Sequence, residues 1–170
     1  MDIRDAATTD AQTLLELMRT IDSQTDYMLF EEEERSSSAE RQERVLESVE
    51  KNPRLNLLVA EEEGVLLGYL ALTQLEQSRV RHCAKLVCGV TQSAWGKGIG
   101  GRLMIAGIER AKALEVTRIE LTVVTDNKRA TNLYEKHGFK VEGVRRGSLR
   151  VQDRFYDEYY MALSLVGEGA

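Results

Sequence analysis

The sequence predicts an α/β fold in which helices cover both faces of a mixed β-sheet. Segments with strand character and segments with helical periodicity follow one another in the order β-α-α-β-β-β-α-β-α-β-β. Helices that lie between strands pack on both faces of the sheet that those strands form. The 170 residues are 42% hydrophobic and 30% charged, which is typical of a globular domain. We expect a single domain over residues 1–166 and a short tail at 167–170.

The first residues predict a short strand and an amphipathic helix. Residues 2–4 have strand character. The hydroxyl of Thr8 or Thr9 can accept a hydrogen bond from the first turn of a helix, which is the role of an N-cap. Apolar residues then recur at the spacing of one helical face. That face consists of Leu14, Leu17, Met18 and Ile21.

A second helix and three strands are expected next. Ser37 and Glu40 have the spacing of a capping box, which predicts a helix over about 38–51. Pro53 ends that helix, because the residue before a proline avoids the helical conformation. The strands that follow are rich in apolar residues, and a turn at 63–64 joins the first two of them. We expect these strands at 55–61, 65–75 and 83–90.

The C-terminal part predicts two further helices, each followed by strands. A helix should start near Gly98, and residues 118–124 read as a strand because they alternate and are rich in β-branched side chains. Residues 126–127 can cap a short helix over 128–137, which Gly138 should stop in the usual position after the C-cap. The last two strands are expected at 139–146 and 155–165.

Composition and charge exclude several classes of protein. The net charge of −5 and the pI of about 5.2 argue against a general nucleic-acid binder, which needs a basic face to neutralise phosphates. The spacing of Cys83 and Cys88 matches neither a zinc knuckle nor a redox motif, so we expect no metal. The N-terminus has no signal-peptide pattern, and no run of about 18 apolar residues could span a membrane. We therefore expect a cytoplasmic protein with no membrane contact.

A glycine-rich segment precedes the third predicted helix. The amides of a first helical turn lack helical acceptors and, with the helix dipole, form a site for anions such as phosphate. Glycines permit positive φ angles and let a large ligand approach the main chain. The segment is not a P-loop, because Arg102 and Leu103 stand where that motif needs Lys and Ser or Thr, and its mid-chain position does not fit a dinucleotide-binding fingerprint. The glycines are Gly96, Gly98, Gly100 and Gly101.

A second motif, N-x-x-A-x-x-L-Y-x-x-x-G-F, runs from Asn127 to Phe139. With the glycine loop at 97–100, it makes the chain resemble the GNAT superfamily of acetyl-CoA-dependent N-acetyltransferases. The resemblance covers almost the whole chain in element order. It implies the family's mixed, mostly antiparallel central sheet, splayed at the cofactor site. One departure is that Trp95, or Gln92 in a looser register, stands where the family usually has Arg or Gln before the glycines.

The resemblance implies that acetyl-CoA is the co-substrate, with no metal. Main-chain amides of the glycine segment would hold the pyrophosphate, and the pantetheine arm would add to strand 83–90 as a short β-partner. Asn127 can cap its helix, position the cofactor, or do both. The cofactor-binding residues that the resemblance implies are Cys88, Gly89, Val90, Trp95, Gly96, Lys97, Gly98, Ile99, Gly100, Gly101, Asn127, Ala130, Tyr134 and Lys136.

The resemblance also implies direct transfer within a ternary complex. The thioester would lie between the splayed strands 83–90 and 118–124, where the substrate amine attacks it. The main-chain N–H of Val90 would stabilise the tetrahedral oxyanion. Tyr134 is the predicted general acid, which protonates the departing thiolate.

The acceptor is expected to be the primary amine of a small molecule, such as an amino acid or a polyamine-like compound. The motif that begins at Gly143-x-x-Arg146 and continues over 155–163 resembles the subgroup that acetylates free amino acids and related amines. Two alternatives remain: a protein N-terminal or lysine acetyltransferase, whose peptide needs an open groove beside residues 22–40, and a non-catalytic acyl-CoA-binding module. A homodimer is possible. The candidate acceptor-binding residues are Phe30, Glu31, Glu34 and Tyr156.

Overall fold

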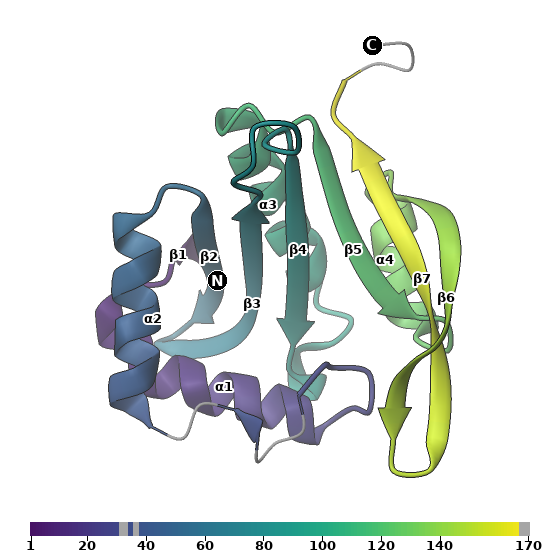
Figure 1. The fold of residues 1–170 in the computed structure, drawn as a ribbon. Helices are drawn as coiled ribbons and strands as arrows, with labels where there is room; N and C mark the ends of the chain where they lie inside the picture. The colour runs from purple at the N-terminus through teal and green to yellow at the C-terminus, as the bar shows by residue number, and fades with distance from the viewer. Residues whose placement is uncertain (31–33, 36–37, 167–170) are drawn as a thin grey trace.

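The computed structural model describes residues 1–30, 34–35 and 38–166, and a seven-stranded sheet runs through these ranges (Figure 1). The strand order is β1-β2-β3-β4-β5-β7-β6. Every neighbouring pair is antiparallel except β4 and β5, which are parallel. The predicted mixed, mostly antiparallel sheet is therefore confirmed. The strands are β1 (Asp2–Asp5), β2 (Leu55–Glu62), β3 (Val65–Gln74), β4 (Cys83–Val90), β5 (Arg118–Val124), β6 (Lys140–Val151) and β7 (Arg154–Ser164).

Helices cover both faces of the sheet, as predicted. In Figure 1, α1 and α2 lie in front of the sheet while α3 and α4 lie behind it. Leu14 and Leu46 belong to the core on the first face, and Leu103 and Met104 to the core on the second. Within the described ranges, no helix is long and apolar enough to cross a membrane. The helices are α1 (Ala11–Ser23), α2 (Ala39–Lys51), α3 (Ile99–Ala113) and α4 (Lys128–Lys136).

The start of α1 corrects one expectation. Neither Thr8 nor Thr9 is the cap; a short 3-10 turn precedes the helix, and the carboxylate of Asp10 accepts the main-chain N–H of Ala7 at 2.8 Å. Asp10 is held in place by two hydrogen bonds from the Arg4 guanidinium, at 2.6 and 2.9 Å. A charged acceptor that is already oriented by an arginine satisfies the entering amides better than a threonine hydroxyl.

Most predicted boundaries agree with the structure to within two residues. Strands β4 and β5 begin and end where the sequence places them. Helix α2 has Ser38 as its N-cap, whose hydroxyl accepts the N–H of Arg41 at 3.3 Å, whereas the predicted cap Ser37 lies outside the described residues. The helix still ends at Lys51, before the Asn52-Pro53 pair.

The hairpin of β6 and β7 is longer than predicted. β6 continues to Val151 rather than ending near Arg146, and residues 149–151 pair with the first residues of β7. Gly147 at φ 54° lies in a register shift that interrupts the periodicity, which hides the second half of the strand in the sequence. Figure 1 shows this hairpin at the edge of the sheet.

Strands β4 and β5 part soon after they begin. They pair only from Cys83 to Lys85 on β4, against Arg118 to Glu120 on β5. Beyond these residues β4 remains paired with β3 on one side only, while β5 continues along β7. Figure 1 shows the two strands diverging toward the C-terminal end of β4. The divergence is the splay that the family resemblance implies, and it exposes the main chain of the last residues of β4.

Candidate active site

A cleft of about 700 Å³ opens where β4 and β5 part. Its walls are the end of β4, the segment that leads into α3, the helix α4, and residues at and after the end of α1. Among the predicted cofactor residues, Lys97 alone does not line the cleft. Those that line it are Cys88, Gly89, Val90, Trp95, Gly96, Gly98, Ile99, Gly100, Gly101, Asn127, Ala130, Tyr134 and Lys136.

The glycine segment presents main-chain amides to this cleft. Gly96 and Gly98 have φ angles of 77° and 79°, and an added Cβ at either would meet no atom within 4 Å. Gly98 is the N-cap of α3, and the first helical hydrogen bond runs from the N–H of Arg102 to its carbonyl at 3.1 Å. Residues 95–98 form a turn, and within the described part of the chain no well-formed main-chain hydrogen bond is donated by the amides of residues 96–101. Such converging amides at a helix N-terminus form an anion site.

Two other glycines have a packing role. A Cβ at Gly100 would lie 3.0 Å from Leu133 Cδ2, so this glycine lets α4 approach the start of α3. A Cβ at Gly89 would lie 2.9 Å from Tyr69 Cε1 and 3.3 Å from Ile21 Cδ1. At both positions neighbouring side chains occupy the space that a Cβ would need. Gly100 is therefore required for packing as well as for the ligand access that the sequence interpretation gives to its segment.

The end of β4 turns main-chain groups into the cleft. Thr91 donates its N–H to Leu67 on β3 at 3.0 Å. Because successive residues of a strand direct their N–H and C=O groups to opposite sides, those of Cys88 and Val90 face away from β3, toward the parted β5. The indole N–H of Trp95 donates to the Val90 carbonyl at 2.9 Å. Among the described residues this leaves the Val90 N–H and both main-chain groups of Cys88 without a strand partner, so they are available to a ligand.

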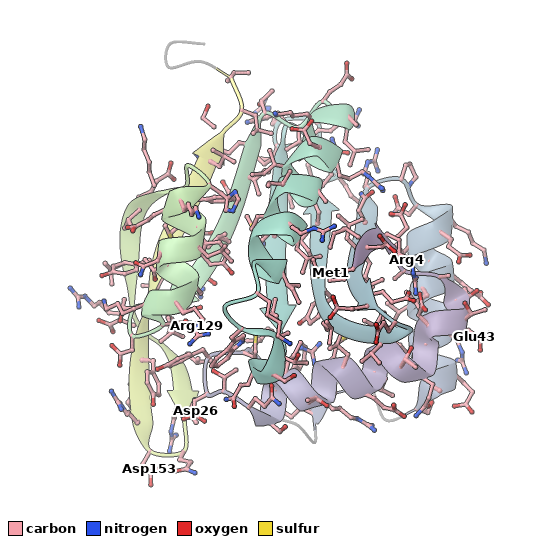
Figure 2. The ribbon with its side chains drawn as sticks, turned by 180° about the vertical axis from the view of Figure 1, so that it is seen from behind. Met1, Arg4, Asp26, Glu43, Arg129 and Asp153 are labelled. Carbon is pink, nitrogen blue, oxygen red and sulfur yellow. The ribbon has the colours of Figure 1, made fainter. Side chains whose placement is uncertain are left out.

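Trp95 and Arg129 form the wall beside the glycine segment. The Arg129 guanidinium lies 3.9 Å from the centroid of the Trp95 ring, a cation–π distance. Figure 2 shows Arg129 at the first turn of α4, on the side that faces the start of α3. Gln92, the other candidate for the Arg or Gln position, does not line the cleft and is bonded to Gln24 instead.

Helix α4 is capped at both ends and carries Tyr134. The Asn127 side chain accepts the N–H of Ala130 at 3.1 Å, as an N-cap does. At the other end, Phe139 N donates to Tyr134 O at 3.1 Å and Gly138 N donates to Glu135 O at 3.0 Å, which is a Schellman motif with Gly138 at φ 89°. The motif N-x-x-A-x-x-L-Y-x-x-x-G-F therefore specifies a helix with fixed ends.

The Tyr134 side chain is largely buried where it lines the cleft. The residue is 6% exposed, and its ring lies 5.9 Å from that of Phe139. None of the described residues forms a hydrogen bond with the hydroxyl. Burial raises the pKa of Tyr134 far above its ordinary value, and the neighbouring Cys88 and Tyr69 add to the shift. Tyr134 therefore stays protonated at neutral pH and is available as a proton donor.

Another part of the cleft is lined by residues from the end of α1 and the segment after it, including Thr25, Tyr27 and Met28. The Tyr27 ring meets the Tyr156 ring of β7 edge to face, with centroids 6.3 Å apart and planes at 81°. This contact joins the segment after α1 to β7, which lies beyond the gap between β4 and β5 in the strand order. The predicted acceptor residue Tyr156 thus lies beside the cleft, in contact with a residue that lines it.

The other predicted acceptor residues are placed differently. Phe30 and Glu34 line a second cavity of about 420 Å³ beside α2, β2 and β3, and the main cleft does not include them. The ring of Phe30 lies against the Arg35 guanidinium, 4.6 Å from its centroid. Glu31 lies outside the described residues. The structure therefore does not bring Phe30 and Glu34 to the main cleft.

Comparison with known proteins identifies the family. The model of the acetyltransferase (GNAT) family matches residues 16–139, which is most of the chain. The chain belongs to the GNAT acetyltransferase family. Among curated relatives of this GNAT protein, the L-amino acid N-acetyltransferase AaaT of Escherichia coli (strain K12) is 35% identical over 113 residues, which cover 65% of this chain and 68% of AaaT.

Solved GNAT structures have the same fold. The acetyltransferase of the GNAT family from Streptococcus pneumoniae is 29% identical, with a TM-score of 0.91 over 96% of this chain and 98% of its own. The putative acetyltransferase yncA from Salmonella typhimurium, solved with acetyl-CoA, is 22% identical, with a TM-score of 0.88 over 100% of this chain and 96% of its own. The second likeness shows the fold alone.

This GNAT cleft also contains residues that sequence reasoning did not single out. Lys128 and Arg129, in the first turn of α4, bring positive charge to the cleft, and Lys136 adds to it from the same helix. Within the described ranges none of the three forms an ion pair. In the sequence, Lys128 and Arg129 form a basic pair directly after Asn127, and this pair could have indicated the positive charge of the cleft. Tyr27 and Met28 carried no such signal, because the segment after α1 has no periodicity.

Replacing Asn127 by Ala should lower the free energy of unfolding by about 0.5–2 kcal/mol, because the N–H of Ala130 loses its acceptor. Thermal unfolding followed by circular dichroism measures this loss. Asn132→Ala on the same helix is the matched control, since Asn132 is not the cap. Equal stability of Asn127→Ala and the wild type would contradict the capping role.

Proposed function

We propose that the protein transfers the acetyl group of acetyl-CoA to the primary amine of a small molecule, by direct attack within a ternary complex. The observation that carries the proposal is the cleft itself. The glycine segment, Tyr134 and Tyr27 all line it, and the Tyr27 ring contacts that of Tyr156. The Salmonella typhimurium relative is described with acetyl-CoA as its cofactor, which supports the choice of donor.

The cofactor would lie along the cleft from the start of α3 to the end of β4. The pyrophosphate would accept hydrogen bonds from the amides of residues 96–101, which we call the phosphate loop, with charge compensation from Lys128, Arg129 and Lys136. The pantetheine arm would pair with the free main-chain groups of Cys88, as an added strand does. This arrangement brings the thioester close to Val90 and Tyr134.

The reaction needs no covalent intermediate on the protein. A neutral amine attacks the thioester carbon, and the oxyanion would accept a hydrogen bond from the free N–H of Val90. As the carbon–sulfur bond breaks, Tyr134 donates its proton to the thiolate and later regains one from the ammonium through solvent. Burial raises the pKa of the Cys88 thiol to about 12, so Cys88 stays protonated and is a poor nucleophile.

The contact between Tyr27 and Tyr156 favours a small acceptor over a peptide. A peptide needs an open groove beside the segment after α1, and here that segment reaches β7. The name of the relative AaaT, an L-amino acid N-acetyltransferase, supports the same choice. A protein N-terminus or lysine would enter only if the two rings separated.

We expect turnover with small primary amines and none with peptides. Release of free thiol from acetyl-CoA, measured with a panel of L-amino acids, polyamines and short peptides, tests this directly. Activity with the amino acids or polyamines alone supports the proposal. Activity with peptides alone would indicate a protein acetyltransferase, and tight CoA binding without thiol release would indicate a non-catalytic module. Tyr27→Ala is the matched variant: it should extend activity to peptides if the ring contact excludes them.

A further inference from the structure

The end of α1 makes side-chain contacts with two separate parts of the chain. Asp22 forms an ion pair with Arg35, which follows the segment that lines the acceptor end of the cleft. Gln24, the C-cap, is bonded to Gln92, which precedes the phosphate loop. None of these four residues lines the cleft, yet each is joined to a part of the chain that does.

The Asp22–Arg35 pair is buried. The side chain of Asp22 is 0% exposed and that of Arg35 is 14% exposed. Arg35 donates to the Asp22 carboxylate from both Nε and Nη2, the second at 3.1 Å, and from Nη2 to the Tyr69 hydroxyl at 3.4 Å. Losing either partner leaves an uncompensated buried charge, so the pair holds the chain at residue 35 firmly against α1.

The residues of the acceptor wall lie between the two members of this pair in sequence. Thr25, Tyr27 and Met28 follow Asp22 and precede Arg35, and all three line the cleft. Tyr27 N also donates to the Thr25 hydroxyl at 3.2 Å, which makes a local turn. Because the ion pair fixes the chain on both sides of these residues, it limits where the Tyr27 ring can lie.

The Gln24–Gln92 contact is reciprocal. The main-chain N–H of Gln92 donates to the Gln24 side-chain carbonyl at 2.8 Å, and the Gln92 side-chain amide donates to the Gln24 main-chain carbonyl at 2.7 Å. Gln92 opens the short helical turn Gln92–Ala94, which leads directly into Trp95 and the glycines. The two bonds therefore fix the entry of the phosphate loop against the same end of α1.

We propose that the end of α1 is a positioning element with two separable sides. The Asp22–Arg35 pair sets the acceptor wall, and the Gln24–Gln92 contact sets the phosphate loop. The inference rests on the proposed function for the identity of the two substrates. Since none of these residues reaches the cleft, each is a positioning residue, and its loss affects the binding of one substrate more than the chemical step.

Arg35→Lys tests the acceptor side. Lysine keeps the charge beside Asp22, which protects the fold, but it lacks the planar fork that engages both carboxylate oxygens. We expect the KM of the fastest amine in the panel to rise by about tenfold, with kcat and the Kd of CoA changed less than about twofold. Hydrogen exchange of the amides at 24–30 should be faster than in the wild type.

Gln92→Ala tests the contact that sets the phosphate loop, and it should give the opposite pattern. The Kd of CoA should rise by about tenfold while the amine KM changes less than about twofold. Trp95 is the single tryptophan of the chain and lines the cleft, so its fluorescence measures CoA binding without turnover. Hydrogen exchange should increase at 92–101 and not at 24–30.

Arg79→Lys is the control, because Arg79 is exposed and precedes β4 at the end opposite the cleft; it should change nothing. The inference is overturned if both variants disturb both sides alike, or if neither changes exchange or binding. Exchange and fluorescence do not require catalysis. Should the exchange pattern hold while no amine is acetylated, the proposed function fails and the positioning element stands.

Discussion

Tyr134→Phe is expected to lower kcat by about 10- to 1000-fold while the protein remains folded. The phenol hydroxyl has no hydrogen-bond partner among the described residues, so its removal breaks no contact and leaves the ring against Phe139. The leaving thiolate then departs without a proton donor. A thiol has a pKa of about 8.5, so the thiolate can leave without being protonated, and a residual rate is expected.

The measurement is steady-state thiol release at saturating acetyl-CoA and amine, with thermal unfolding as the test of folding. Tyr160→Phe is the matched control, since Tyr160 lies exposed on β7 and should retain the wild-type rate. Because burial raises the pKa of Tyr134, the variant should also keep the wild-type pH profile below about pH 9, where the free amine fraction sets the rate. Wild-type kcat in Tyr134→Phe would remove the residue from the mechanism.

Gly98→Val should raise the Kd of CoA at least about tenfold. Gly98 has a φ of 79°, which costs a residue with a Cβ about 1–2 kcal/mol and a β-branched residue more. The loop then either carries that strain or leaves the conformation in which its amides converge. In the first case only the stability of the protein falls. In the second case CoA must restore the converging conformation when it binds, and at about 1.4 kcal/mol for each factor of ten this weakens anion binding by the stated amount.

Gly64→Val is a well-matched control for this change. Gly64 has a φ of 81° and, like Gly98, nothing within 4 Å of an added Cβ, but it lies in the β2–β3 turn. It should lose similar stability and bind CoA normally, as read from Trp95 fluorescence. Equal CoA affinity in both variants would show that the conformation of the glycine loop does not govern cofactor binding.

Local patterns predicted the fold well and singled out residues that the structure brings together in one cleft. Strands such as β4 and β5 were found because β-branched and apolar residues cluster between turn residues, and the capped helix α4 because Asn127 and Gly138 mark its ends. The same motifs carry the family resemblance, so the glycine segment and Tyr134 could be singled out together. Local chemistry and function coincide in these segments.

The acceptor side could not be predicted in the same way. Arg35 meets Asp22 across 13 positions, Gln92 meets Gln24 across 68, and neither distance follows from periodicity. Phe30 and Glu34 were candidate acceptor-binding residues, yet they line a different cavity. Contacts between distant segments depend on the assembled sheet, and a single sequence contains no direct record of them.

The separation of β4 and β5 has a consequence for the stability and abundance of the protein. Without ligand, β4 carries main-chain groups at Cys88 and Val90 that no neighbouring strand satisfies, so the sheet is incomplete at its centre. Under the proposed function, acetyl-CoA supplies the missing hydrogen-bonding partner and binds only the native chain. Mass action then adds about 2.7 kcal/mol of stability at a hundredfold excess over Kd. The abundance of the enzyme in a cell would accordingly rise and fall with the metabolic supply of its own donor.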